Sequence, residues 1–281
     1  MAESASNTEW LAPEPRIIRP VARRVRVREL WTTLPVARML GLRDMKVKYK
    51  QAALGPLWLI IAPLGMLAAI TIAFSGVTSV QTGGVPYLLF ALSGLTVWTC
   101  VQLSASLGLL AIVGNAALVR RSPIPRVALV TGSMLGNIPP LAMMFSLLLI
   151  STIAVRGLPI QALLLPLLIV WVYVFSLSVA LILGALTARF RDTSSITPLF
   201  IQAGIFVTPV GYSLHGSPRN IHTLLTLNPV TGMIEAWRWA LFAAPSTDWT
   251  AIIIAGAWTV VLLSVAWRVF ASQEVHFADF V

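Results

Sequence analysis

Long apolar runs dominate the chain after residue 56. A helix needs about 20 mostly apolar residues to cross the hydrocarbon core of a bilayer. Runs of this kind predict spans near residues 57–78, 87–112, 127–154, 159–187, 196–213 and 249–270. They are too long and too uniformly apolar to be barrel strands. The pattern predicts an all-α polytopic membrane protein with six transmembrane helices.

Helix breakers are most concentrated in the third and fifth of these spans. The third holds a cluster of glycine, asparagine and proline residues, namely Gly132, Gly136, Asn137, Pro139 and Pro140. The fifth holds Pro198 and Pro209. Membrane helices tolerate such residues where neighbouring helices satisfy the freed backbone groups. We therefore expect a kink or break in the third span.

The segment 214–248 is much longer than a connecting loop needs to be. Asn228 and Pro229 form a helix-start signal, and Glu235 and Arg238 follow with the i,i+3 spacing that lets side chains pair on one helix face. The segment predicts outer re-entrant or interfacial helices before the last span.

Residues 27–50 alternate apolar with basic side chains. Treated as a helix, this stretch lies along the inner membrane surface with its cations towards lipid headgroups. These cations are Arg38, Arg43, Lys46 and Lys50. The run M-K-V-K-Y-K at 45–50 also fits a strand period, so an N-terminal amphipathic interface helix and a local strand stay open there.

Basic residues also predict orientation. With six spans, 17 of the 20 Lys and Arg residues share one side, and eleven of them precede the first span. The positive-inside rule then places both termini in the cytoplasm. Residues 1–27, which contain prolines and arginines without an apolar core, predict a flexible basic cytoplasmic tail rather than a signal peptide. The tail either fixes orientation or binds the membrane surface.

Composition excludes several function classes. Only 11% of residues are charged, against about 25% in a soluble domain. No carboxylate occurs between Asp44 and Asp192, so this stretch faces lipid or itself. These features exclude a soluble enzyme and a nucleic-acid-binding protein, and the single Cys100 excludes an internal disulfide.

Reactive side chains are scarce, and we predict no catalytic residue, no metal site and no bound cofactor. His215, His222 and His276 have no Cys or carboxylate at ligand spacing. No lysine follows a glycine, so the chain has no phosphate loop for ATP. The predicted spans also lack a buried ionisable relay. If the chain transports, its energy comes from another polypeptide.

Two groups of residues remain as candidates for binding. Trp98, Trp171, Tyr173 and Phe175 either line a channel and stack on sugar rings or belong to an interfacial aromatic belt. The compact cytoplasmic connection 113–126 either docks a partner or is a plain turn. Its candidate residues are Asn115, Arg120, Arg121, Pro123 and Arg126.

Five segments then carry a family resemblance. They are R-D-M-K-V-K-Y-K-Q-A-A-L-G-P-L-W at 43–58, N-A-A-L-V-R-R-S-P-I-P-R at 115–126, R-F-R-D-T-S-S-I at 189–196, F-V-T-P-V-G-Y at 206–212 and N-P-V-T-G-M-I-E-A-W-R at 228–238. From about residue 28 to the end, the chain resembles the polysaccharide-export permeases of the type-two ABC transporter family. These include O-antigen, capsule and teichoic-acid export permeases.

The resemblance implies a transmembrane domain over residues 28–281 that works as two permeases with two ABC ATPase subunits. ATP and Mg²⁺ would be used by the ATPase, and a lipid-linked polysaccharide would cross the bacterial inner membrane at the permease dimer interface. It implies that 115–126 is the coupling helix beside the ATPase. The Ala- and Arg-rich composition resembles that of actinobacterial chains and points to cell-wall galactan as one candidate glycan.

Two rival functions stay open at this point. An ion-coupled or facilitative secondary carrier would need a buried relay or an inverted repeat. A membrane enzyme acting on a lipid-linked sugar would need paired acids, and only Asp192, Glu235 and Asp248 are available.

Overall fold

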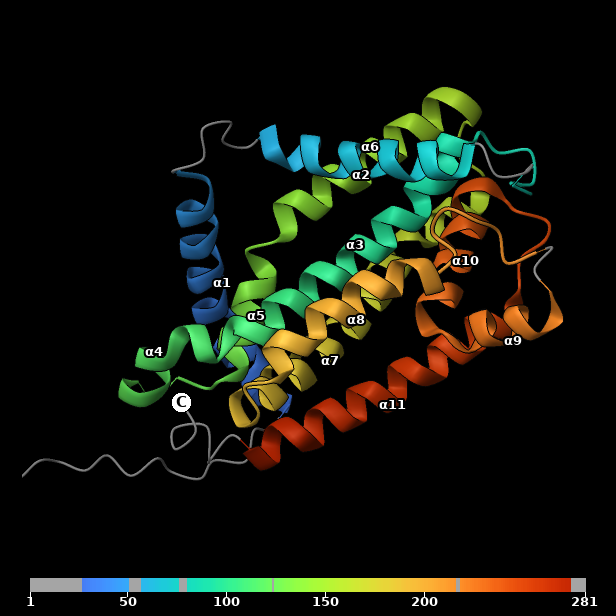
Figure 1. Cartoon of the computed structure of the whole chain (residues 1–281). Coiled ribbons are helices and arrows are strands. Elements are labelled where there is room, and N and C mark those ends of the chain that lie inside the picture. Colours follow the sequence, from blue (N-terminus) through green and yellow to red (C-terminus); the bar gives the residue numbers. More distant parts are fainter. Residues whose placement is uncertain (1–26, 51–56, 76–79, 123, 216–217, 274–281) are drawn as a thin grey trace, which may run out of the picture.

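The computed structural model describes residues 27–50, 57–75, 80–122, 124–215 and 218–273. Within these ranges every regular element is a helix. Figure 1 shows the long helices running side by side, with α1, α4 and α5 at one end of the molecule and α9 and α10 at the other. We call these the inner end and the outer end. The predicted tail, apart from Val27, lies outside the described residues.

The helices follow one another without intervening strands in the described ranges. In chain order they are α1 (Val27–Lys50), α2 (Trp58–Ser75), α3 (Tyr87–Ala111), η2 (Val113–Asn115), α4 (Ala116–Arg121), α5 (Val127–Leu135), α6 (Ile138–Arg156), η3 (Ile160–Leu164), α7 (Leu165–Arg189), α8 (Thr193–Val207), α9 (Arg219–Leu227), α10 (Pro229–Phe242) and α11 (Trp249–Gln273).

Helix α3 forms the centre of the fold. It packs against α2, α5, α6, α7, α8 and α10, and most of its residues are buried. Its crossing with α7 is very close, because a Cβ atom at Gly108 would lie 2.5 Å from the Ala180 Cα, and one at Gly184 would lie 2.9 Å from the Gly108 oxygen. Small residues let membrane helices approach and gain packing contacts in this way.

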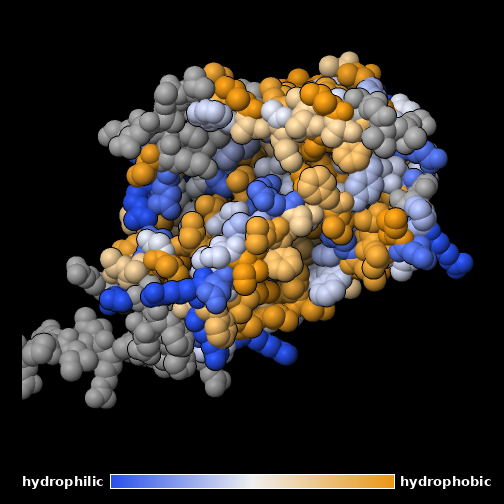
Figure 2. Space-filling view, in the orientation of Figure 1, coloured by the Kyte–Doolittle hydropathy of each residue, from blue (hydrophilic) through white to orange (hydrophobic). Residues whose placement is uncertain are grey.

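Other helices present apolar side chains outward. Ile72 of α2, Ile150 of α6, Phe200 of α8 and Ile253 of α11 are each at least 65% exposed, and apolar residues cover much of the surface in Figure 2. An apolar surface of this extent is compatible with lipid and not with water. The chain is therefore a multi-pass membrane protein.

In the described part of the chain, four helical segments are long and apolar enough to cross a bilayer. They are Tyr87–Ala111, Ile138–Arg156, Ile160–Arg189 and Trp249–Gln273. The apolar parts of the first and fifth predicted spans are shorter, at Ile61–Phe74 and Thr193–Val207.

The break expected in the third predicted span is present. Within the predicted span 127–154, α5 ends at Leu135 and α6 begins at Ile138. Pro139 and Pro140 lack a backbone N–H and fit only the first turn of a helix, so they start α6. Of these two helices, α6 alone, which extends to Arg156, is long and apolar enough to cross a bilayer.

The fifth predicted span also ends early. Helix α8 stops at Val207, and Thr208 adopts extended dihedrals with φ −112° and ψ 133°. Proline disfavours a helical conformation in the residue before it, so Pro209 explains the stop. Residues 208–213, which the prediction included in the span, are not helical.

The predicted interface helix is present as α1, which continues to Lys50, so the alternative strand at 45–50 is wrong. It packs closely on α5. A Cβ atom at Gly41 would lie 2.7 Å from the Gly132 oxygen, and one at Gly136 would lie 2.9 Å from the Gly41 oxygen. These glycines hold α1 against the chain at the inner end.

We expect Gly108→Ala to destabilise the protein. The added methyl group meets the backbone of Ala180 rather than a flexible side chain, and overpacking of this kind costs about 1–3 kcal/mol. The matched control is Gly256→Ala in α11, where a Cβ atom would meet nothing within 4 Å. Thermal unfolding in detergent checks the difference, and equal midpoints for the two variants would contradict the close α3–α7 crossing.

Candidate functional site

The outer end contains a buried charged site on α10. Asn228 starts this helix by accepting a hydrogen bond from the Val230 N–H at 3.0 Å, and Pro229 follows at the first helical position, where its fixed φ suits the helix. Almost every residue of α10 is buried. Glu235 and Arg238 therefore lie among packed side chains, with exposed fractions of 5% and 3%.

Arg238 binds the non-helical segment that follows α8. Its Nη2 donates to the carbonyl oxygens of Pro209 at 2.9 Å and Val210 at 3.0 Å, and to that of Phe90 in α3 at 3.4 Å. Its Cζ atom also lies 3.5 Å from the centroid of the Phe90 ring, a cation–π contact. One guanidinium thus joins α10, α3 and the segment after α8.

Glu235 supplies the opposite charge. Its Oε1 lies 3.7 Å from Nη1 of Arg238, as the i,i+3 spacing predicted. Burial lowers the pKa of Arg238 to about 10, and Glu235 opposes that shift. Burial raises the pKa of Glu235, and the nearby Arg238 and His215 oppose it. Arg238 therefore stays protonated at neutral pH.

Two further side chains hold the same segment. Asn228 Nδ2 donates to Thr208 Oγ1 at 3.0 Å and to the Val207 oxygen at 3.3 Å. The Tyr87 hydroxyl donates to the Gly211 oxygen at 2.8 Å. We call residues 208–211 with Arg238, Asn228 and Tyr87 the outer clamp. The backbone oxygens of residues 209–211 accept from side chains because no helix supplies partners there.

The structure adds a histidine–carboxylate contact that sequence spacing did not reveal. Nε2 of His222 lies 3.5 Å from Oδ2 of Asp248. Oδ1 of Asp248 accepts from the backbone N–H groups of Thr250 and Ala251 and so caps α11. Within the described ranges, no three His, Cys, Asp or Glu side chains come together as a metal site. We assign this contact a structural role between α9 and α11.

At the inner end, the connection 113–126 is joined to α1. Nη2 of Arg43 donates to Asn115 Oδ1 at 3.2 Å, and Asn115 Nδ2 donates to the Ala111 oxygen at 2.9 Å. Asn115 thus fixes the start of α4 against both α3 and α1. This contact brings two separately predicted groups, the interface helix and the connection, into one unit.

The predicted docking cations of the connection differ in their surroundings. Arg120 is exposed on α4. Arg126 is half-buried, and its Nη2 donates to the Val119 oxygen at 3.3 Å, so it holds α4 to the start of α5. Arg121 lies in the last turn of α4, and Pro123 lies outside the described residues.

The interface-helix cations also differ. Arg43 pairs with Asp44 at 2.8 Å, and Lys46 is exposed. Arg38 lies beside a surface crevice. Lys50 is the last residue of α1, and its side chain lies outside the description.

The four aromatic candidates do not share one surface. Trp98 is buried, and a Cβ atom at Gly204 of α8 would lie 2.6 Å from its ring. Phe175 is buried in the same core cluster. Trp171 donates its indole N–H to Thr259 Oγ1 at 2.9 Å, and Tyr173 is half-buried against a second core cluster, which includes Ile112 and Val130. Their role in lining a channel stays a prediction.

We expect Arg238→Met to loosen the outer clamp, because the Pro209 and Val210 oxygens lose their donor. Leaving buried carbonyl groups unsatisfied costs about 1–3 kcal/mol each. Labelling of Ser213→Cys by a membrane-impermeant maleimide, in a Cys100→Ser background, measures the loosening. The control is Arg219→Gln on the exposed start of α9. Unchanged labelling in Arg238→Met would contradict the clamp.

Comparison with known proteins agrees with this architecture. The family model described as "ABC-2 type transporter" matches residues 36–242. The chain is 26% identical over 258 residues to the O-antigen export system permease protein RfbA of Myxococcus xanthus, covering 90% of this chain and 98% of that protein. It is 27% identical to RfbA of Klebsiella pneumoniae, over 70% of this chain and 76% of that protein.

A third relative is the polysialic acid transport protein KpsM of Escherichia coli, which is 22% identical over 72% of this chain and 79% of its own length. The family match begins within α1 and ends with α10, and so includes most of the interface helix, the connection 113–126 and the outer clamp. The chain belongs to the ABC-2 type transporter family.

Proposed function

We propose that this chain is the permease subunit of an ATP-driven exporter that moves a lipid-linked polysaccharide across the bacterial inner membrane. The observation that carries the proposal is the match along 98% of an O-antigen export permease. A polysialic acid transport protein among the relatives supports the same substrate class. An O-antigen-like glycan or a cell-wall galactan is the substrate we propose.

The energy for export is proposed to come from a separate ABC ATPase. The chain has no phosphate loop, so ATP and Mg²⁺ would be bound by that partner. We infer that α4 receives the movement of the ATPase. Arg120 offers an exposed cation there, whereas Arg126 serves the internal packing of α4.

Movement of α4 would reach the membrane helices by two routes. Hydrogen bonds of Asn115 hold the connection 113–126 against α3 and, through Arg43, against α1. Helix α1 in turn is packed on α5 through glycines at backbone contact distance. A rigid unit of this kind suits a mechanical input, because close-packed elements transmit displacement rather than absorb it.

We propose six membrane-inserted helical segments with both termini in the cytoplasm. Helices α2 and α8 would be the two shorter ones, and the excess of Lys and Arg at the inner end supports this orientation. A polar glycan needs a lined path through the bilayer. We propose that the path forms between two copies of the chain, each paired with one ATPase subunit. Of the aromatic candidates, Trp171 and Tyr173 keep exposed surface for contact with the glycan there, whereas Trp98 and Phe175 are buried.

The rival functions are not favoured. The relatives are export and transport proteins rather than enzymes. Glu235, one of the few acids available to an enzyme acting on a lipid-linked sugar, is paired with Arg238 of the outer clamp.

We expect Arg120→Glu to reduce co-purification of the ATPase subunit at least several-fold, because a carboxylate replaces a cation on the exposed face of α4. Tagged protein in mild detergent, followed by mass spectrometry of its partners, measures this. Arg156→Glu, an exposed site at the end of α6, is the control and should retain the partner. A pure wild-type preparation without any ATPase would contradict the whole proposal.

We expect Glu235→Gln to give graded rather than complete loss of glycan export. The glutamine keeps the shape of the side chain, and Arg238 keeps its three carbonyl partners. Export of labelled glycan by vesicles containing both subunits measures the loss. The amount of assembled complex in the vesicle membrane is the folding control. Complete loss in a normally assembled complex would instead favour the membrane enzyme.

A further inference from the structure

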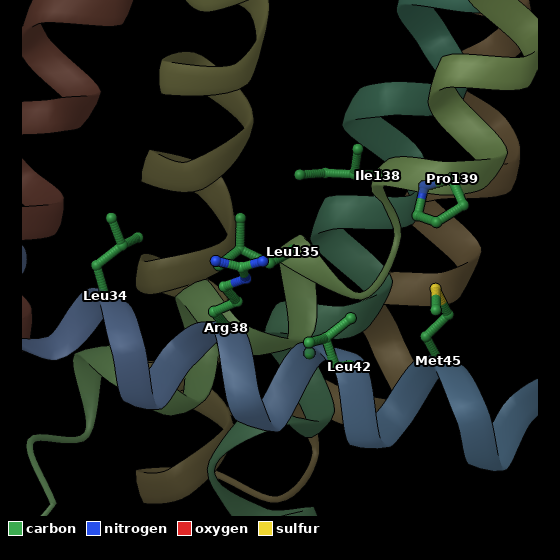
Figure 3. A pocket seen from close by; sticks show the side chains of 8 residues that line it. Leu34, Arg38, Leu42, Met45, Leu135, Ile138 and Pro139 are labelled. Carbon is green, nitrogen blue, oxygen red and sulfur yellow. The ribbon is translucent and has the colours of Figure 1, made fainter.

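A crevice of about 370 Å³ opens between α1 and the junction of α5 with α6. Its residues come from two sources. Helix α1 contributes Leu34, Arg38, Gly41, Leu42 and Met45, and the junction contributes Leu135, Ile138 and Pro139. Figure 3 shows the α1 side chains directed towards the residues of the junction. The volume lies in the range of about 300–1,000 Å³ that small-molecule sites occupy.

The crevice follows from the helix break. Gly41 brings α1 into backbone contact with α5 at Gly132 and Gly136. Helix α5 then ends at Leu135 and α6 begins at Ile138, and both of these residues line the crevice. Gly41 is itself part of the lining, and Leu34, Leu42, Leu135 and Ile138 form apolar walls.

Arg38 is the single charged residue of this lining. In Figure 3 its side chain extends from α1 on the side of Leu135, and the residue is exposed. The structure gives it no ion-pair or hydrogen-bond partner in the described part of the chain, whereas Arg43 on the same helix is paired with Asp44. A cation beside apolar walls matches a ligand that has both an anionic group and a hydrocarbon chain.

We propose that this crevice binds an anionic phospholipid, with its phosphate on Arg38 and an acyl chain along the apolar walls. Basic pockets between membrane helices on the cytoplasmic side suit such headgroups. A free phosphate would leave the walls in contact with water, and a neutral chain would leave Arg38 without a counterion. The basic segment 16–26 of this chain carries the same charge sign as Arg38 and is a poor occupant.

The proposal rests on the proposed cytoplasmic placement of α1, because anionic lipids are attracted to basic side chains at that leaflet. It adds a lipid site to a helix that also contacts the connection through Arg43. A bound lipid would bridge α1 and the α5–α6 junction. It would therefore stabilise the packing of α1 on α5 independently of ATP or glycan.

The test compares thermal unfolding of the full chain in detergent before and after adding phosphatidylglycerol or phosphatidylcholine. We expect phosphatidylglycerol to raise the Tm of the wild type by several degrees more than phosphatidylcholine does. Arg38→Gln should lose that difference. Arg268→Gln, which removes an exposed cation from the last turns of α11 at the same end, should keep it.

A second variant tests the acyl chain. Ile138→Trp fills the crevice and leaves Arg38 in place, so it should also lose the response to phosphatidylglycerol. Soluble glycerol phosphate is expected to give no stabilisation. Equal responses of wild type and Arg38→Gln would overturn the proposal, as would equal stabilisation by the two phospholipids.

A polyprenyl phosphate that displaces phosphatidylglycerol at much lower concentration would also overturn the proposal, since the site would then hold the lipid carrier of the substrate. These experiments measure lipid binding alone. A negative result would therefore contradict the lipid site without contradicting the proposed export function, which co-purification of the ATPase tests.

Discussion

The interrupted backbone after α8 is the constraint on which the outer end depends. A proline at 209 stops the helix, and the carbonyl groups that follow have no helical partners in a molecule whose surroundings include lipid. Unsatisfied backbone groups are expensive there. Arg238 satisfies two of them and the Phe90 oxygen as well. The buried charge is in turn neutralised by Glu235, so a break in one helix determines which residues α10 must carry.

Helix α3 connects the two ends of the molecule. Its first turn supplies Phe90 to the outer clamp, and its last residue, Ala111, accepts from Asn115 at the connection. Between them it crosses α7 at backbone contact distance through Gly108. A displacement at the inner end therefore meets a continuous packed element that reaches the clamp. Such continuity is a physical route for coupling, which mutants along α3 can quantify.

Close packing of helices holds the inner end together, whereas a buried charged side chain holds the outer end together. Helix α1 is amphipathic, and its seat on α5 depends on Gly41, Gly132 and Gly136 rather than on ion pairs. The helix break that makes room for this contact also leaves the crevice beside Arg38. One local feature, the cluster of glycine, asparagine and proline residues at 132–140, thus explains both the kinked path of the chain and the site we propose there.

The sequence by itself determined the helical membrane class, the break at 132–140 and the Glu235–Arg238 spacing, because length, apolar runs and helix periodicity are local properties. It also determined the family, through segments spread along the chain. Only the tertiary structure decided which groups these residues meet. The carbonyl partners of Arg238 lie 28 to 148 residues away, and Asn115 meets Arg43 across 72 residues. Such contacts follow from how helices cross, and helix crossing depends on packing that no local pattern contains.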